Sequence, residues 1–417
     1  MIAEIITIGD ELLNGTHVDT NSVHLARRLD TTGLEVGYIT TTGDDPDRLV
    51  EAIHLALRRA DIVITTGGLG PTDDDITKKA ICKAFKRNLI FHENVLEEMQ
   101  KRFAARGVKM PSINQNQALL PQGAKFLANR IGSALGIIIE EGGKFFCAMP
   151  GVPIEMQIMT DEELAPLLRL KAGTTVIVRR RIRTAGITES ALAEKIRPAL
   201  KFSEGMTLAY LPSVRGVDLC IRGSGTVKEE VQAGINLMAG SIREVAGDVI
   251  YTEDDRELEQ IVGELLAEKR LTLAVAESCT GGLLGGRITS IPGSSAYFKG
   301  GIIAYSNDVK INRLNVPRET IEQFGAVSAE TAQAMAVGAT IIAAADIGLA
   351  VTGIAGPSGG APEKTVGTVY IGLAAFGKGK SERFAFGGDR DSIRERAVTT
   401  ALNMLRKELI GALDRKM

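Results

Sequence analysis

The stretch TLAVAESCTGG, residues 272–282, decides how the C-terminal part of the chain is interpreted. Residues 272–276 are apolar and β-prone, as expected of a strand buried in a sheet. The strand is followed by four polar or nucleophilic residues and two glycines, namely Glu277, Ser278, Cys279, Thr280, Gly281 and Gly282. Side chains at this edge lie beside the N–H groups that begin the next helix, which can stabilise an anion. We expect Ser278 to be a nucleophile, with N–H groups around Thr280 to Gly282 holding an oxyanion.

The distribution of histidines restricts the base that could activate Ser278. All four histidines lie in the first quarter of the chain, which leaves Ser-Lys as the remaining common arrangement in the C-terminal part. The segment KGGIIAYSNDVK predicts a strand over 301–305 and a helix capped by Ser306 or Asn307, with Lys310 near its first turn. The helix dipole and burial disfavour an ammonium there, so Lys310 could act as a base. The alternative is a tight turn with a solvated lysine, and spacing alone does not separate the two.

Two further segments of the C-terminal part point to the same sheet edge. Residues 328–345 predict a helix with Ser328 as N-cap, and the strand IGLAVT leads into the glycine loop GIAGPSGG (353–360). In GDRD (388–391), Arg390 near the start of the last helix has the fork geometry that suits a phosphate. Arg394 and Arg396 are interpreted as solvated helix residues.

Together, AESCTGG, YSNDVK, GIAGPSGG and GDRD resemble the CinA C-terminal family, the nicotinamide mononucleotide deamidases, over about residues 256–414. The resemblance implies a deamidase without a cofactor, in which Ser278 is the nucleophile, Lys310 the base and Tyr305 a further catalytic participant. The residues expected to bind substrate are Cys279, Thr280, Gly281, Gly282, Thr352, Gly353, Gly356 and Arg390.

Composition sets the class of protein. A chain of 417 residues should hold two or three domains, and 44% hydrophobic with 24% charged residues is typical of a soluble globular protein. A net charge of −2 provides no overall basic field for nucleic acid. The four cysteines are scattered without a CxxC, and the N-terminus lacks the basic head of a signal peptide. We therefore expect a cytoplasmic protein that does not bind membranes.

The N-terminal part alternates strands and helices. Strands are predicted over 2–8, 36–41 and 61–68, with helices over 22–29 and from Pro46. This alternation favours a parallel sheet with helices on both faces, and ligands bind beyond the carboxyl ends of such strands.

The motif TTGGLGPTDDDIT (65–77) follows the third strand. Gly67, Gly68 and Gly70 would let the backbone approach a phosphate at the helix start. The run Asp73–Asp75 would repel that phosphate unless a divalent cation bridges them, so we expect a metal at Asp74 and Asp75. The alternative is an N-capped turn, since Asp is favoured in the first helical turn.

The motif GDELL with Gly15, the pattern ending in Asp75 and Thr77, and MPGVPIEM (149–156) resemble the molybdopterin-binding fold, and more closely the CinA N-terminal domain. The resemblance covers about residues 1–168 and implies an ADP-ribose pyrophosphatase with Asp75 as a catalytic residue. Leu69 stands where the molybdenum cofactor proteins usually have threonine, which argues against a pterin carrier. The residues expected at this site are Asp10, Glu11, Gly67, Gly68, Gly70, Thr77, Pro150 and Gly151, with Pro153 and Glu155 at the rim.

The middle of the chain, 172–250, predicts the order strand, helix, two strands, helix, strand, which resembles the KH-type module between the two CinA enzymatic domains. Its arginines could touch RNA, but no GxxG clamp accompanies them and aromatic residues are scarce. We therefore favour a structural or subunit-contact role for Arg179, Arg180, Arg181 and Arg183.

The sequence thus predicts an α/β protein with a molybdopterin-binding-like domain (1–170), a KH-type module (171–252) and a deamidase domain (253–417). The expected partners are nicotinamide mononucleotide, ADP-ribose and a second copy of the chain. Membranes are excluded, and nucleic acid is disfavoured. Two rival classes stay open. One is a protein that binds a pterin or nucleotide without turnover, and the other is a competence factor that binds nucleic acid.

Overall fold

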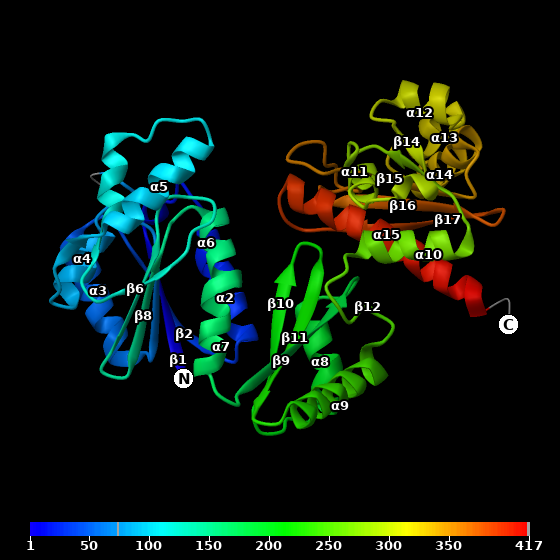
Figure 1. Ribbon diagram of the computed structural model, residues 1–417. Helices are drawn as coiled ribbons and strands as arrows, with labels where there is room; N and C mark the ends of the chain where they lie inside the picture. The colour runs from blue at the N-terminus through cyan, green and yellow to red at the C-terminus, as the bar shows by residue number, and fades with distance from the viewer. Residues whose placement is uncertain (73–74, 415–417) are drawn as a thin grey trace. The chain divides into compact units, whose positions relative to one another are not determined.

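The computed structural model describes residues 1–72 and 75–414, which form two compact units (Figure 1). The first contains Met1–Val178 and Gly223–Ala233, and the second contains Arg179–Arg222 and the chain from Gly234 onward. The second unit thus joins most of the middle module to the C-terminal domain.

The N-terminal domain is built on a six-stranded sheet with the order β2-β1-β3-β8-β7-β6. The strands are β1 (Ile2–Ile8), β2 (Glu35–Thr42), β3 (Ile62–Thr66), β6 (Lys125–Leu127), β7 (Gly136–Glu141) and β8 (Lys144–Met149). The first four in this order are parallel, whereas β7 and β6 are antiparallel to their neighbours. The parallel arrangement predicted for the first three strands is confirmed, and β7 and β6 add an antiparallel extension. Gly142 and Gly143, both at positive φ, form a two-residue hairpin turn between β7 and β8.

Helices cover both faces of this sheet (Figure 1). One face packs against α2 (Thr20–Thr31), α6 (Pro153–Met159) and α7 (Ala165–Lys171), through Leu25, Met156 and Leu168. The other packs against α3 (Pro46–Arg59), α4 (Thr77–Ala84) and α5 (Glu93–Ala105), through Ile53, Ile81 and Met99. Shorter elements are α1 (Asp10–Leu13), the 3₁₀ helix Ser112–Ala118, the π-helical turn Thr160–Leu164, and the strand pair β4 (Leu89–Phe91) and β5 (Leu119–Pro121).

The middle module has the expected element order, with a sheet ordered β10-β11-β9-β12. Its strands are β9 (Val176–Thr184), β10 (Met206–Ser213), β11 (Gly216–Gly225) and β12 (Ile250–Thr252). Its helices are α8 (Glu189–Ile196), which ends in a 3₁₀ turn over Arg197–Ala199, and α9 (Lys228–Ala246).

The C-terminal domain contains a five-stranded sheet ordered β14-β13-β15-β16-β17. These strands are β13 (Leu273–Glu277), β14 (Phe298–Ile303), β15 (Ile347–Gly353), β16 (Thr368–Ala375) and β17 (Lys378–Ala385). Strand β13 is parallel to β14 and β15, so their carboxyl ends meet at one edge, while β16 and β17 are antiparallel.

Six helices and one 3₁₀ turn complete this domain. One core contains buried residues of α10 (Leu258–Lys269), α11 (Leu283–Thr289) and α15 (Arg390–Asp414). The opposite core contains residues of α12 (Asn307–Leu314), α13 (Arg318–Phe324) and α14 (Ala329–Ala343), and the 3₁₀ turn spans Ser294–Ala296. Ser306 and Ser328 cap α12 and α14 as expected, by accepting from Val309 N–H and Thr331 N–H. Among residues 1–72 and 75–414, no helix combines the length and apolar character of a membrane span.

Candidate active sites

The C-terminal site begins where β13 ends. All five residues of β13 are buried, and the N–H of Ser278 continues the strand by donating to the carbonyl of Val351 on β15 (2.9 Å). The chain then turns through Gly281 and Gly282, whose φ values of 60° and 97° lie in the left-handed region that side chains disfavour. This turn leaves Ser278 largely buried, with 8% of its surface exposed, at the shared edge of the parallel strands.

Glu277 organises the start of α11. Its buried carboxylate accepts hydrogen bonds from the N–H groups of Gly282 (3.0 Å), Leu284 (3.0 Å) and Gly285 (2.8 Å). The N–H of Gly281 donates to the carbonyl of Ser278 (3.2 Å). The expectation that the N–H groups of both glycines are available for an oxyanion is therefore wrong, because protein oxygens already accept from them.

The N–H groups of the two residues before these glycines are not used in this way. Within the described residues, the N–H groups of Cys279 and Thr280 have no protein acceptor. They directly follow Ser278, so they are the donors left for negative charge that develops beside its hydroxyl. The buried hydroxyl of Thr280 also has no partner in the described part of the chain.

Lys310 lies against Ser278, as the sequence predicts. It is the fourth residue of α12 and only 1% exposed. Its Nζ lies 3.1 Å from Ser278 Oγ, 2.8 Å from the carbonyl oxygen of Ala304 and 3.5 Å from that of Tyr305. A neutral amine has two N–H donors and one lone pair. With the donors directed to the two carbonyls, the lone pair can accept the proton of Ser278.

Burial shifts the pKa values of Lys310 and Cys279, the two neighbours of Ser278, in opposite directions. It lowers the pKa of Lys310 below its ordinary value, against a smaller opposing effect of Cys279, and so favours the neutral amine. It raises the pKa of the Cys279 thiol to about 11, so almost no thiolate exists near neutral pH. Both effects favour Ser278 over Cys279 as the nucleophile.

Arginines of α15 line the same edge. Arg390 donates to the carbonyl of Gly356 (2.6 Å) and to the hydroxyl of Tyr305 (3.3 Å), which brings the glycine loop and the YSNDVK segment together. Arg394 donates to the carbonyl of Thr280 (2.9 Å), and Arg396 donates to the carbonyl of Gly387. The interpretation of Arg394 and Arg396 as simply solvated is wrong, because both hold loop carbonyls.

Three other predicted residues have packing roles. Tyr305 contacts Lys310 through its carbonyl, while its side chain is 63% exposed. The hydroxyl of Thr352 donates to the carbonyl of Ala326 (2.8 Å), which anchors β15 rather than facing solvent. A Cβ on Gly353 would lie 2.8 Å from the carbonyl oxygen of Thr368, so this glycine permits close strand pairing.

In the N-terminal domain, the glycine loop is held by the residues that follow it. Asp75 accepts from the N–H of Gly70 (2.7 Å) and from the N–H (2.8 Å) and hydroxyl (2.5 Å) of Thr72. Thr77 donates to the carbonyl of Gly67 (2.8 Å), and a Cβ on Gly68 would lie 2.4 Å from its hydroxyl oxygen. The glycines are therefore required first by packing within the loop.

The carboxyl ends of β1, β3 and β8 bring the other predicted residues near this loop. A pocket of about 150 Å³ is lined by residues that include Glu11, Asn21, Thr66, Gly151 and Pro153. Asn21 donates to Thr66 Oγ1 (3.0 Å) and to the carbonyl of Gly151 (2.8 Å). Asn21 is not among the residues predicted from the sequence, although the segment DTN after GDELL has a polar residue there.

The remaining predicted residues of this site bind other parts of the protein. Asp10 exchanges hydrogen bonds with Asp44, its N–H donating to Oδ2 of Asp44 (3.1 Å). The carbonyl of Pro150 accepts from Thr66 (2.9 Å), and Glu155 accepts from Asn129 (2.7 Å). These contacts fix the backbone around the pocket.

Lys78, also absent from the residues predicted from the sequence, is a buried lysine. Its Nζ donates to the carbonyl of Asn116 (2.8 Å) and to Oε1 of Gln117 (3.1 Å), and Gln117 in turn donates to the carbonyl of Leu69 (2.9 Å). Burial lowers the pKa of Lys78 to about 8, against the opposing effect of Asp75. Lys78 therefore connects the glycine loop to the 3₁₀ helix 112–118.

The residues expected to hold a metal do not form a ligand set. No group of three or more His, Cys, Asp or Glu side chains in residues 1–72 and 75–414 could hold a metal ion. Asp75 already accepts three hydrogen bonds from the loop, and Asp74 lies outside the described residues. The described residues therefore do not fit a metal by themselves.

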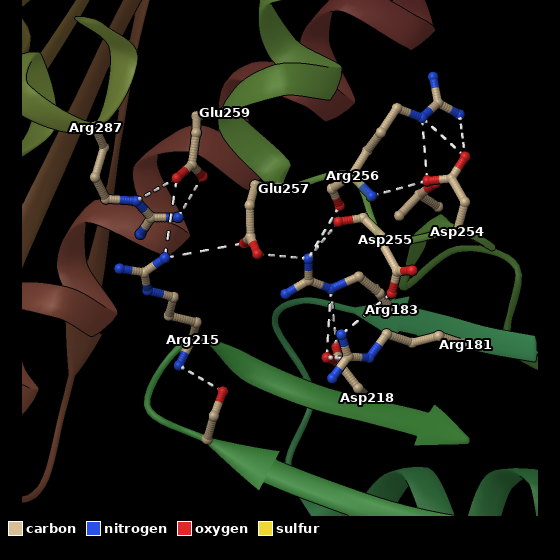
Figure 2. Close-up of polar contacts among 12 residues, drawn as sticks. Arg181, Arg183, Arg215, Asp218, Asp254, Asp255, Arg256, Glu257, Glu259 and Arg287 are labelled. Atoms are coloured by element: carbon tan, nitrogen blue, oxygen red, sulfur yellow. Dashed lines mark hydrogen bonds and ion pairs between the residues drawn. The ribbon is translucent and has the colours of Figure 1, made fainter. Parts of the chain in front are cut away.

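The arginines of the middle module pair with acidic and amide groups. Figure 2 shows the acidic partners of Arg181 and Arg183. Arg180 donates to Asn236 (2.7 Å), Arg181 lies 3.4 Å from Asp218, and Arg183 lies 2.8 Å from Glu257. Arg183 also donates to backbone carbonyls at 255 and 256. These pairs match the structural role that the sequence favours for them.

Comparisons with known proteins agree with this architecture. Residues 4–170 match the family described as "Probable molybdopterin binding domain", residues 179–252 match "Damage-inducible protein CinA KH domain", and residues 255–409 match "CinA C-terminal domain". The fold is thus that of an α/β protein with these three parts in this order.

Relatives cover the whole chain. A CinA-like protein of Dictyoglomus thermophilum is 42% identical over 99% of this chain and 100% of its own length. A CinA-like protein of Gemmatimonas aurantiaca is 44% identical over 98% of this chain and 96% of its own length. The crystal structure of the competence/damage inducible protein CihA from Agrobacterium tumefaciens is 43% identical and covers 36% of this chain and 93% of that one, with a TM-score of 0.36. The chain belongs to the CinA family.

Proposed function

We propose that the C-terminal domain hydrolyses the carboxamide of nicotinamide mononucleotide to nicotinate mononucleotide and ammonia. The observation that carries the proposal is the buried Lys310 Nζ, 3.1 Å from Ser278 Oγ, with two backbone carbonyls that accept its protons. Family membership supports the same reaction, because the nucleophile and base fall on the motifs that resemble the deamidases.

The first half of the reaction acylates Ser278. Neutral Lys310 takes the hydroxyl proton as Oγ attacks the carboxamide carbon, and the N–H groups of Cys279 and Thr280 hold the oxyanion. Lys310 then returns the proton to the amide nitrogen, the C–N bond breaks, and ammonia leaves. In the second half, water attacks the acyl-enzyme while Lys310 accepts and returns a proton, which releases nicotinate mononucleotide and free Ser278.

The phosphate of the substrate would bind away from the chemistry. Arg390 and Arg394 present guanidinium groups on the first turns of α15, and their contacts with Gly356 and Thr280 orient both toward the site edge. We assign the phosphate to Arg390, as the sequence predicts, with Arg394 beside it. Tyr305 holds Arg390 through its hydroxyl.

The test is turnover by the purified full chain. Nicotinate mononucleotide and ammonia should form in equal amounts, and Ser278→Ala should abolish both products. Arg390→Ala should raise KM more than it lowers kcat. Unchanged turnover in Ser278→Ala would remove the proposal.

A second activity is proposed for the N-terminal domain, the hydrolysis of ADP-ribose to AMP and ribose 5-phosphate. It is favoured by the pocket of about 150 Å³ at the carboxyl ends of the parallel strands, beside the glycine loop. A divalent metal is the expectation raised by the acidic run, and no step of the proposal passes through it. Measuring AMP formation with and without a chelator tests both the hydrolysis of ADP-ribose and its dependence on a metal. Binding without AMP formation would favour a nucleotide- or pterin-binding role.

The competence-factor class predicts RNA or DNA binding by the middle module. Because Arg180, Arg181 and Arg183 have protein partners, we expect no salt-sensitive binding near micromolar concentration. A binding curve that weakens steeply with salt and disappears in Arg179→Ala/Arg180→Ala/Arg181→Ala would favour the nucleic-acid role instead.

A further inference from the structure

The middle module and the C-terminal domain share a core within the second unit. Ala185, directly after β9, is fully buried in the cluster formed by α10, α11 and α15, and Tyr251 of β12 packs against it. Two residues of α15 hold the backbone of the module: Asn403 donates to the carbonyl of Ala185 (3.3 Å) and Arg406 to that of Ile250 (3.1 Å). The module is therefore fixed to the longest helix of the domain that carries Ser278.

A buried ion pair lies between α10 and α11. Arg287 of α11 and Glu259 of α10, 6% and 5% exposed, form two hydrogen bonds of 3.2 and 2.6 Å. Arg287 also donates to the hydroxyl of Thr399 on α15 (2.8 Å). One guanidinium thus joins three helices of the C-terminal domain.

A second acid, Glu395, and a second arginine, Arg215, complete this cluster. Figure 2 shows Arg215 beside the Arg287–Glu259 pair. Glu395 of α15 lies 3.7 Å from Arg287, and its buried Oε2 has no hydrogen-bond partner among the described residues. Arg215, in the β10–β11 turn of the middle module, lies 3.4 Å from Glu395 and 4.0 Å from Glu259. Glu257 also lies 3.9 Å from Arg215, but it has Arg183 as a closer partner at 2.8 Å. Glu259 and Glu395 are therefore balanced by Arg287 and Arg215, and the middle module supplies Arg215.

The cluster is adjacent to the turn that carries Ser278. Helix α11, which holds Arg287, begins immediately after that turn. On α15, the residue before Glu395 is Arg394, whose guanidinium donates to the carbonyl of Thr280 (2.9 Å). Without Arg215, two largely buried carboxylates would share one guanidinium, which is costly in a medium of low dielectric constant. A shift of α15 or α11 that relieves this repulsion would move Thr280 relative to Lys310.

We propose that Arg215 of the middle module is a positioning residue for the Ser278–Lys310 site, acting through Glu395 on α15 and through Glu259 on α10, which pairs with Arg287 of α11. The proposal rests on the proposed deamidase function and adds that the middle module is part of that enzyme. Arg215 contacts neither substrate nor the reacting atoms, so it should affect kcat more than KM.

The test compares Arg215→Ala with Arg180→Ala in the full chain. Arg180 is a matched control, because its partners are Asn236 on α9 and Glu253 directly after β12, and neither belongs to the Arg287–Glu259–Glu395 cluster. Arg215→Ala should lower kcat about tenfold with KM nearly unchanged, since small displacements of reacting groups are expensive. Arg180→Ala should stay within about twofold of wild type, and Arg215→Lys, which keeps the charge, should recover most of kcat.

Two further measurements make the result decisive. Adding Glu395→Gln to Arg215→Ala removes the surplus negative charge and should restore kcat to within about threefold of wild type. The rate at which a fluorophosphonate labels Ser278, followed by mass spectrometry, should fall in parallel with kcat and needs no nucleotide. If the wild type is labelled but does not turn over nicotinamide mononucleotide, the proposed substrate is wrong while labelling still tests Arg215. Equal labelling rates in wild type and Arg215→Ala would overturn the inference, as would an unreactive Ser278 in the wild type.

Discussion

The substitution Lys310→Met tests the central pair of the proposed deamidase. Methionine keeps most of the length of the side chain but provides neither a basic nitrogen for the proton of Ser278 nor an N–H for the carbonyls of Ala304 and Tyr305. A positioned general base contributes about 10²–10⁴-fold to a rate. Since Lys310 serves in both half-reactions, we expect kcat to fall at least about 10³-fold.

Stability should change much less than activity. The variant loses the cost of burying an amine that is 1% exposed, but leaves two carbonyls without this donor, at about 1–3 kcal/mol each. These effects oppose each other, so the free energy of unfolding should stay within about 2 kcal/mol of wild type. A folded, inactive variant separates the chemical role of Lys310 from a structural one.

The pH dependence follows from the lowered pKa of Lys310. The neutral amine is the active form, so kcat/KM should rise with pH through a pKa below the ordinary lysine value of 10.5 and then level off. Between that pKa and 10.5 the unfolded chain binds more protons at this residue than the folded chain, so the stability of wild type relative to Lys310→Met should increase with pH.

The assay is the formation of nicotinate mononucleotide by purified wild type, Lys310→Met, Ser278→Ala and the double variant, with thermal unfolding measured in parallel. Because nucleophile and base act as a unit, the double variant should be within about threefold of the worse single variant. Activity of Lys310→Met within tenfold of wild type would refute the assignment of Lys310 as the base. So would losses that multiply in the double variant.

Three other changes test the remaining assignments. Cys279→Ala should keep kcat within about threefold of wild type, because burial raises the thiol pKa to about 11 and leaves little thiolate; a dead variant would make the cysteine the nucleophile. Asp75→Asn should lower AMP formation from ADP-ribose at least about 100-fold and leave deamidation unchanged, because the amide loses the negative charge and one of the two oxygens that accept three hydrogen bonds from the loop; full AMP formation would exclude a role for Asp75. Lys78→Met should change how the free energy of unfolding depends on pH. The pKa of Lys78 is lowered from 10.5 to about 8, so the free energy of unfolding of wild type should rise by about 3 kcal/mol relative to the variant between pH 8 and 10.5. A stability difference that denaturant titrations find independent of pH would contradict that shift.

Much of the local structure could be predicted from the sequence. The apolar run of β13, the two glycines after Thr280 and the serine caps of α12 and α14 each depend on residues within a few positions of one another. Such features follow from backbone conformation and from side chains that satisfy nearby N–H groups. The β7–β8 hairpin also has a local signal, the pair Gly142 and Gly143, for which the sequence analysis makes no prediction.

Contacts between residues that are distant in the sequence are decided only by the tertiary structure. Lys310 approaches Ser278 across 32 positions, and its pKa depends on burial that no local pattern reveals. The sequence predicts that the N–H group of Gly282 is available to an oxyanion. In the structure Glu277 accepts from it, because the packing of β13 against α11 directs this carboxylate to the start of the helix. The pairing of Arg215 with Glu395, 180 positions apart, exists because the middle module shares a core with α15. Sequence patterns record what each segment can form alone, whereas burial and charge pairing arise only when separate segments exclude water together.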